Sequence, residues 1–223
     1  MPIGGNDWLA LTPELTLEPE IPVCDPHHHF WVRRPEPPAY QQYLLADLTA
    51  DINSGHNVRS TVFIEARSEY RIDGPEELHS VGEVEFVQKL ADEFATGAHG
   101  PARAAAAIIG RADLKLGDGV RPVLEALQAA SPNRFRGIRH STGWDPSPEV
   151  PDREIQGVLA TDGYRAGARV LAEMGFLLEN SLYFPQLGEL ADFANAVPEL
   201  TIVLNHIGGL CRVGPYANRD NEV

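Results

Sequence analysis

Three consecutive histidines, within the segment 25–29 (DPHHH), are the residues of this chain best suited to chemistry. The apolar run 21–24 precedes them and predicts a buried β-strand that ends where the histidines begin. Because side chains alternate between the two faces of a strand, His27 and His29 should share one face, with His28 on the other. Two adjacent imidazoles at a strand end are typical of a site that binds a metal ion or a substrate, whereas His28 should pack against a helix layer.

A third histidine, His206, and the guanidinium of Arg139 follow later predicted strands. Neutral imidazoles of His27, His29 and His206 would form a ligand set for zinc with one open position for water, and manganese is an alternative ion. Without a metal, the same imidazoles could donate hydrogen bonds to a carbonyl oxygen that gains negative charge. Arg139 could hold an anionic group through a paired planar contact. This set is most consistent with hydrolysis of a lactone or another cyclic ester, the substrate being a small anionic or carbonyl-containing molecule.

Further polar residues near the same strand ends are candidates for contacts with a substrate. They are His140, Glu65, Tyr183 and Gln186. Only one of the neighbours Arg139 and His140 can point into a shared site, because adjacent side chains on a strand face opposite ways. Glu65 has an alternative role as the buried partner of an arginine. Asp25 either orients one of the histidines or caps the turn before them.

The elements that must position these residues alternate between strands and helices. Strands are predicted at 21–27, 59–66, 104–110, 134–141, 175–182 and 201–207, and helices at about 40–54, 78–95, 120–130, 153–159, 163–173 and 185–196. The alanine-rich segment 104–110 could also be helical. Strands that are apolar along their whole length predict a parallel sheet covered on both faces. Polar residues collect at the carboxyl ends of the strands, and no Gly-rich fingerprint follows the first strand. This favours a (β/α)₈ TIM barrel over a doubly wound sheet.

Six strand–helix units fill the chain, whereas a barrel of this type has eight. We therefore expect an N-terminal extension over residues 1–20 and a barrel domain over residues 21–223 that is truncated at its carboxyl end. An incomplete barrel has two exposed parallel edge strands, which favour pairing with a partner. A homo-oligomer is one form that such pairing can take.

Composition narrows the classes of partner. The chain has 18 basic and 32 acidic residues, a net charge of −14, which argues against nucleic acid and anionic membranes as partners. No apolar run approaches the roughly 20 residues that span a bilayer, and the N-terminus lacks the pattern of a signal peptide. Cys24 and Cys211 are far apart in sequence, and Cys24 should be a small core residue. A reducing cytoplasm fits this cysteine usage best.

Four motifs on successive strand ends carry a family resemblance: DPHHHFW, FRGIRH, PQLGEL and LNHIGG, in this order between residues 21 and 209. The chain resembles the amidohydrolase-related family of TIM-barrel hydrolases, which includes the sugar lactonases and the pyrone-dicarboxylate hydrolases. The resemblance implies that His27 and His29 form the strand-one pair that binds a divalent metal or contacts substrate. It also implies that His206 is the strand-six histidine and that Arg139 holds a substrate carboxylate or carbonyl.

The sequence departs from the family pattern in two places. The strand-eight aspartate that activates water in the family lies on a strand that this chain does not contain. The fifth strand lacks the metal-binding lysine or histidine of many relatives, and Glu179 and Asn180 are its nearest polar residues. Three alternatives therefore stay open: a lactone hydrolase, a metal-dependent decarboxylase of the same superfamily, and a catalytically incomplete chain. A fourth alternative is a site that acts without a metal.

Overall fold

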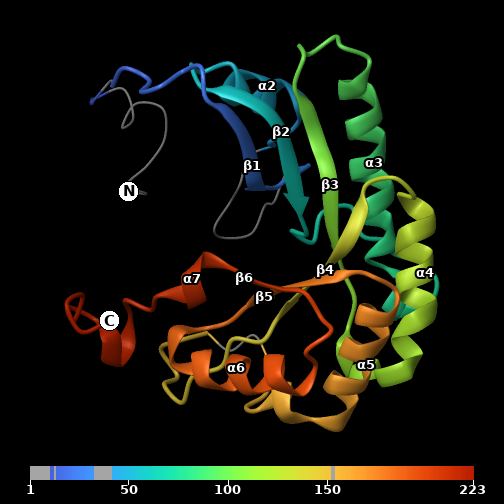
Figure 1. Cartoon of the computed structure of the whole chain (residues 1–223), viewed down its shortest axis with the longest axis vertical. Helices are drawn as coiled ribbons and strands as arrows, with labels where there is room; N and C mark the ends of the chain where they lie inside the picture. Colours follow the sequence, from blue (N-terminus) through green and yellow to red (C-terminus); the bar gives the residue numbers. More distant parts are fainter. Residues whose placement is uncertain (1–10, 13, 33–41, 152–153) are drawn as a thin grey trace.

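A computed structural model describes residues 11–12, 14–32, 42–151 and 154–223 of the chain. Six parallel strands form one sheet in which each strand pairs with the next in sequence order. The strands are β1 (Pro22–His28), β2 (Asn57–Ile64), β3 (Arg103–Arg111), β4 (Phe135–Ser141), β5 (Leu177–Ser181) and β6 (Ile202–Leu204). The sheet curls around one side of the molecule (Figure 1). This sequential, curled order is that of an incomplete TIM barrel rather than a doubly wound sheet.

Helices connect the strands and cover the outer face of the sheet. They are α2 (Leu45–Ile52), α3 (Val81–Ala95), α4 (Arg121–Ala130), α5 (Asp162–Glu173), α6 (Leu187–Ala196) and the single turn α7 (His206–Gly209). Short 3₁₀ turns lie at Glu76–Leu78, Leu114–Val120, Val158–Ala160, Phe184–Gln186 and Gly214–Tyr216. In Figure 1, α3, α4 and α5 line one flank of the molecule, while the concave side of the sheet faces the opposite way. In the described part of the chain, no helix is both long enough and apolar enough to cross a membrane.

The core lies between the sheet and these helices, because every second strand residue points outward. The outward side chains of Phe63, Ile108, Ile138 and Leu178 are fully buried with helix residues such as Leu124. Burial of an aliphatic or aromatic side chain of this size contributes about 1.5–3 kcal/mol. The helix layer therefore fixes the strand register, and with it the residues that reach the concave face.

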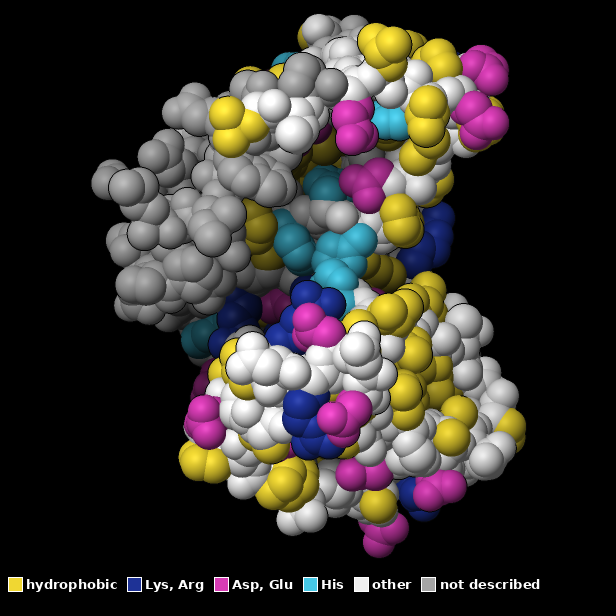
Figure 2. Space-filling model, turned by 90° about the vertical axis from the view of Figure 1, so that its left-hand side faces the viewer, with side chains coloured by type: hydrophobic (Ala, Val, Ile, Leu, Met, Phe, Trp, Pro, Cys, Tyr) yellow, Lys and Arg dark blue, Asp and Glu magenta, His cyan; other side chains and the backbone are white. Residues whose placement is uncertain are grey.

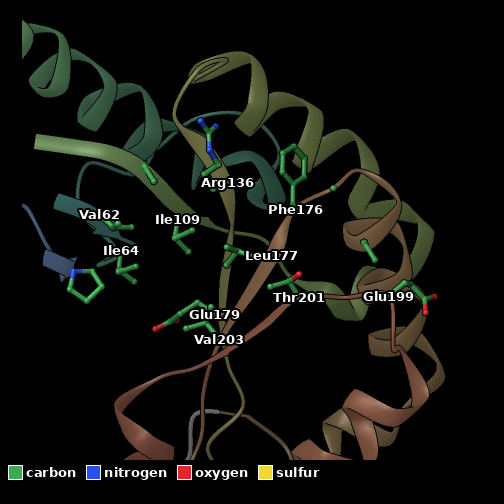
Figure 3. Close-up of a pocket in the computed structure, with 14 residues that line it drawn as sticks. Val62, Ile64, Ile109, Arg136, Phe176, Leu177, Glu179, Glu199, Thr201 and Val203 are labelled. Atoms are coloured by element: carbon green, nitrogen blue, oxygen red, sulfur yellow. The ribbon is translucent and has the colours of Figure 1, made fainter. Parts of the chain in front are cut away.

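The concave face encloses a hollow of about 480 Å³. Its wall includes Val62, Ile64 and Ile109, which face Glu179 and Val203 across the open space (Figure 3). Pro26 of β1 lines the same hollow. The interior of a complete barrel is filled by layers of side chains from all of its strands. With six strands, part of this interior stays open.

The six predicted strands are confirmed, including the alanine-rich one, since β3 spans Arg103–Arg111. The helix expected over 153–159 is wrong for its described residues: 154–157 form bends and turns, and a single 3₁₀ turn follows. Gly157 has a left-handed backbone (φ 69°), which ends any helix there. Residues 1–10 and 13 of the predicted extension, and residues 40–41 of the helix expected from 40, lie outside the described residues.

The expectation that the first and last strands are buried is also wrong. Cys24 of β1 is exposed, and Val203 and Leu204 of β6 are 43% and 39% exposed. Among the described residues, each of these strands pairs on one side only, so its other edge and part of its faces remain open. Cys211, in contrast, is buried.

Candidate active site

His27 and His29 lie at the carboxyl end of β1 and project to the concave side, as side-chain alternation predicted. Their Nε2 atoms are 3.1 Å apart, and the two rings meet edge to face. Asp25 Oδ1 accepts a hydrogen bond from the backbone N–H of His27, so Asp25 caps the turn. In Figure 2, histidine side chains gather in the middle of the open face, where the surface is hollowed, with basic side chains next to them.

Their hydrogen-bond partners fix the tautomers of both rings. The Nδ1 of His29 is 2.7 Å from the carbonyl oxygen of Ile64, which only accepts, so His29 Nδ1 carries the proton. The Nη2 of Arg139, which only donates, is 3.2 Å from His27 Nε2. In their neutral forms, both Nε2 atoms therefore carry a lone pair rather than a proton, and the lone pair of His27 accepts from Arg139.

A proton between the two rings is disfavoured at neutral pH. Burial, followed by the nearby Arg139 guanidinium, lowers the pKa of His27 to about 4. Burial also lowers the pKa of His29, against the opposing effect of its bond to Ile64. Two neighbouring Nε2 atoms that do not take up a proton are a donor set suited to a divalent cation, since neutral imidazole Nε2 is a common metal ligand.

His206 lies beside this pair, on the turn α7 that follows β6. Its ring centre is 5.0 Å from that of His27, and its backbone is left-handed (φ 47°). The structure thus brings together the three histidines singled out in the sequence. Within the described ranges, however, no group of three or more His, Cys, Asp or Glu side chains converges on one point that could hold a metal. The three-histidine metal set stays a prediction.

Arg139 reaches into the same space from β4 and carries an ion pair that the sequence did not predict. Its Nε and Nη2 atoms donate to the two carboxylate oxygens of Glu179 at 2.7 and 3.0 Å. Its Nη1 donates to the backbone oxygen of Glu65 at 2.9 Å. Both residues of the pair are largely buried. Arg139 is therefore paired with an acid inside the site.

The side chain of Glu65 takes part in a buried acidic cluster behind the histidines. Tyr70 donates its hydroxyl to Glu65 Oε1 at 2.5 Å, and burial raises the pKa of that hydroxyl well above its usual range. The fully buried Glu83 accepts hydrogen bonds from the N–H groups of Ala66 and Ser68. Burial, followed by the charge of Glu65, raises the pKa of Glu83 well above its usual value. The cluster fastens the loop that carries the Ile64–Glu65 backbone, which both His29 and Arg139 contact.

Tyr183 and Gln186, expected near a substrate, instead join two loops. The Gln186 amide accepts from the N–H of Trp144 at 2.9 Å and donates to the carbonyl of Thr142 at 3.0 Å. Tyr183 donates its hydroxyl to the carbonyl of Pro151 at 2.6 Å. Gln186 is 3% exposed. The structure shows these residues holding the loop after β4 in place, and their contact with a substrate stays a prediction.

His140 is not brought to the histidine pair. It faces outward from β4, is fully buried against the ring of Tyr164, and accepts a hydrogen bond from the N–H of Leu114 at 3.2 Å. Since Arg139 points inward, the alternation rule places His140 on the helix side. His28 behaves in the same way: it faces outward, lies 2.9 Å from the hydroxyl of Thr61 and packs on aromatic rings, as predicted.

The sequence did not predict the contacts that three residues make at or behind the site: Glu179, Tyr70 and Glu83. For Glu179 a signal was present, because β4 and β5 are neighbours and Arg139 pairs in register with Glu179. Lateral neighbours in a parallel sheet point to the same side, so an arginine and an acid at equivalent strand ends should meet. Tyr70 and Glu83 lie in a loop and a helix, where no strand register fixes their position.

Comparisons with known proteins agree with this architecture. The family model described as amidohydrolase (Amidohydro_2) matches residues 24–217. The uncharacterized protein y4mH of Sinorhizobium fredii is 27% identical over 206 residues, which are 85% of this chain and 63% of the relative.

Two solved structures share the fold. An amidohydrolase from Burkholderia multivorans with bound zinc has a TM-score of 0.59 at 19% identity and covers 83% of this chain and 58% of its own. Amidohydrolase 2 from Bifidobacterium longum subsp. infantis has a TM-score of 0.52 at 20% identity, covering 88% of this chain and 66% of its own.

This chain spans between 58% and 66% of the length of these three relatives. The match to the family model extends from the first strand to beyond the last one and includes every histidine of the site. On that match, the chain belongs to the amidohydrolase family.

Proposed function

We propose that the protein is a hydrolase that opens a lactone or a similar cyclic ester by attack of water at the carbonyl carbon. The observation that carries the proposal is the His27–His29 pair, whose Nε2 atoms lie 3.1 Å apart. Membership of the amidohydrolase family supports the reaction class. The lactone substrate is part of the proposal, chosen because its polarised carbonyl suits a site that combines imidazoles with the guanidinium of Arg139.

His27 and His29 would hold a divalent metal, with zinc preferred for a nitrogen ligand set and manganese as the alternative. The fit rests on the tautomers: neither ring carries a proton on its Nε2, and His29 is oriented by its bond to Ile64. The Burkholderia multivorans relative is a zinc-bound structure, which supports the choice of ion. When bound, such a metal lowers the pKa of water to about 7 and polarises a carbonyl.

The other residues of the site would position the substrate and handle its protons. His206, whose ring lies next to that of His27, would take a proton from water or give one to the leaving oxygen. Arg139 supplies positive charge beside the carbonyl. The apolar wall formed by Val62, Ile64 and Ile109 would accept the carbon skeleton and exclude water.

The test is an activity screen of the purified protein loaded with zinc or manganese. We expect acid release from at least one lactone in a panel of sugar and aromatic lactones, followed with a pH indicator. The variant His29→Asn should lower the rate by at least about 100-fold, because one ligand and its orientation are lost. The matched control His56→Asn changes an exposed histidine before β2 and should leave the rate unchanged.

Two outcomes would count against the proposal. A folded, metal-loaded protein that turns over no lactone would indicate a catalytically incomplete chain. Release of carbon dioxide from unsaturated or aromatic acids, without lactone hydrolysis, would indicate the decarboxylase alternative instead.

A further inference from the structure

The guanidinium of Arg139 occupies the place where a cation at the histidine pair would have to approach. It extends from β4 across the concave face and contacts β1, the segment directly after β2, and β5 at once, through His27, the backbone of Glu65, and Glu179. A guanidinium has five N–H donors. Four of them have acceptors here, two on Glu179, one on Glu65 and one on His27.

A free arginine would be expected at a subsite for substrate anions, yet this one has a single N–H without an acceptor among the described residues. To bind a carboxylate through two parallel hydrogen bonds, Arg139 would have to release one of its present partners. Glu179 is 3% exposed and neutralises the charge at short distance, so it is the partner that is hardest to give up. His27 is the neutral partner, at the longest distance, 3.2 Å.

We propose that Arg139 and a divalent metal ion are alternative partners of His27 Nε2, and that Glu179 sets the balance between them by holding Arg139 in place. The single lone pair of His27 Nε2 cannot accept from Nη2 and coordinate a metal at the same time. Two cations that compete for one nitrogen also repel each other, and this repulsion is strong in a partly buried site. The inference rests on the metal site of the proposed function, but not on any turnover.

Two states of the site follow from this competition. In the metal-free state the guanidinium satisfies His27 and keeps positive charge over the histidine pair. In the metal-loaded state Arg139 moves off His27, remains paired with Glu179 and gains a free N–H that can point at an anionic group of a substrate. Metal loading therefore prepares the arginine for substrate binding.

The test measures zinc affinity by calorimetry at pH 7.5 for the 223-residue protein and its variants. The double variant Arg139→Gln/Glu179→Gln removes the arginine without changing the net charge of the site or leaving a buried carboxylate unpaired. We expect it to bind zinc about tenfold more tightly than the unmodified protein. Glu179→Gln alone leaves an unpaired guanidinium at His27 and should bind zinc at least several-fold more weakly.

Arg136→Gln is the matched control. Arg136 lies on the same strand and is exposed, and within the described part of the chain it donates to the carbonyls of Phe135 and Asn133 and to no histidine. Zinc affinity should therefore stay within about twofold. Thermal unfolding of each variant checks that it is folded. Equal or weaker zinc binding by the double variant overturns the competition, and zinc binding by none of the proteins overturns the metal site as well.

A measurement on the unmodified protein keeps the inference testable if the double variant does not fold. We expect the Nε–H resonance of Arg139 to shift in NMR spectra during a zinc titration, in step with the ring resonances of His27. Histidine resonances that shift while the arginine resonance stays in place would contradict the proposal.

Discussion

At the scale of single residues, the face that a side chain occupies could be predicted, but its partner could not. Alternation along β1 placed His27 and His29 together and His28 apart, as the structure shows. The partner of Arg139 was missed because Glu179 is 40 positions away, and their contact depends on the register of two neighbouring strands. The histidine pair is thus recognisable from the sequence, whereas the ion pair of Arg139 with Glu179 beside it is recognisable only from the fold.

His28 should make the protein sensitive to acid. Burial lowers its pKa to about 4 in the folded state, below the unfolded value of 6.5, so the native state binds fewer protons. Its contribution is present above pH 6.5 and is lost as the pH falls towards 4. The shift corresponds to about 3 kcal/mol of unfolding free energy over that range.

Urea unfolding between pH 7.5 and 4 measures this effect. We expect the variant His28→Gln to lose much less stability on acidification than the unmodified protein, and the exposed-site control His56→Gln to lose as much as the unmodified protein. An identical pH profile for His28→Gln would show that another group carries the acid sensitivity.

At the scale of elements, the apolar strands and their order followed from the sequence, and the connections between them did not. The predicted segment 104–110 proved to be a strand because its outward residues pack under α3 and α4. The helix expected at 153–159 is absent from its described residues. There the left-handed backbone of Gly157 and the hydrogen bonds of Gln186 and Tyr183 to the loop after β4 determine the path of the chain. Such contacts are long-range, and local propensity does not report them.

The two hydrogen bonds of the Gln186 side chain, to Trp144 and Thr142, give a prediction for the loop after β4. The variant Gln186→Leu would leave the N–H of Trp144 and the carbonyl of Thr142 without their partner, at a cost of about 2–3 kcal/mol. Amide hydrogen exchange should accelerate at Trp144 more than in the helices. The same replacement at Gln128, an exposed residue of α4, should change the unfolding free energy by less than about 0.5 kcal/mol. Unchanged exchange at Trp144 would show that the side-chain amide of Gln186 does not hold this loop in place.

At the scale of the whole molecule, the number of strand–helix units correctly indicated an incomplete barrel. The open edges of the two outer strands were expected from the missing units, whereas the exposure of their apolar side chains was not. The apolar pattern of 201–207 resembles a buried strand, but β6 lacks a second neighbour among the described residues, and Leu204 is 39% exposed. Burial depends on what surrounds a strand, and that information lies outside its own residues.

The open edge at β6 predicts self-association. Exposed apolar edge strands tend to pair with other chains, and a lysine on the edge opposes this. We expect sedimentation velocity to show association that increases with protein concentration and that decreases in the variant Leu204→Lys. Leu116→Lys, at a similarly exposed leucine (44%) of the turn Leu114–Val120, is the control and should not reduce association. A protein that stays monomeric at all concentrations would contradict the prediction.

The central claim is that His27 and His29 together hold a divalent metal ion, and zinc calorimetry on the double variant His27→Asn/His29→Asn tests it most directly. We expect the unmodified protein and His56→Asn to bind one equivalent of zinc with the same affinity, whereas zinc binding by the double variant should be at least about 100-fold weaker. Zinc binding by the double variant that equals that of the unmodified protein would contradict the account.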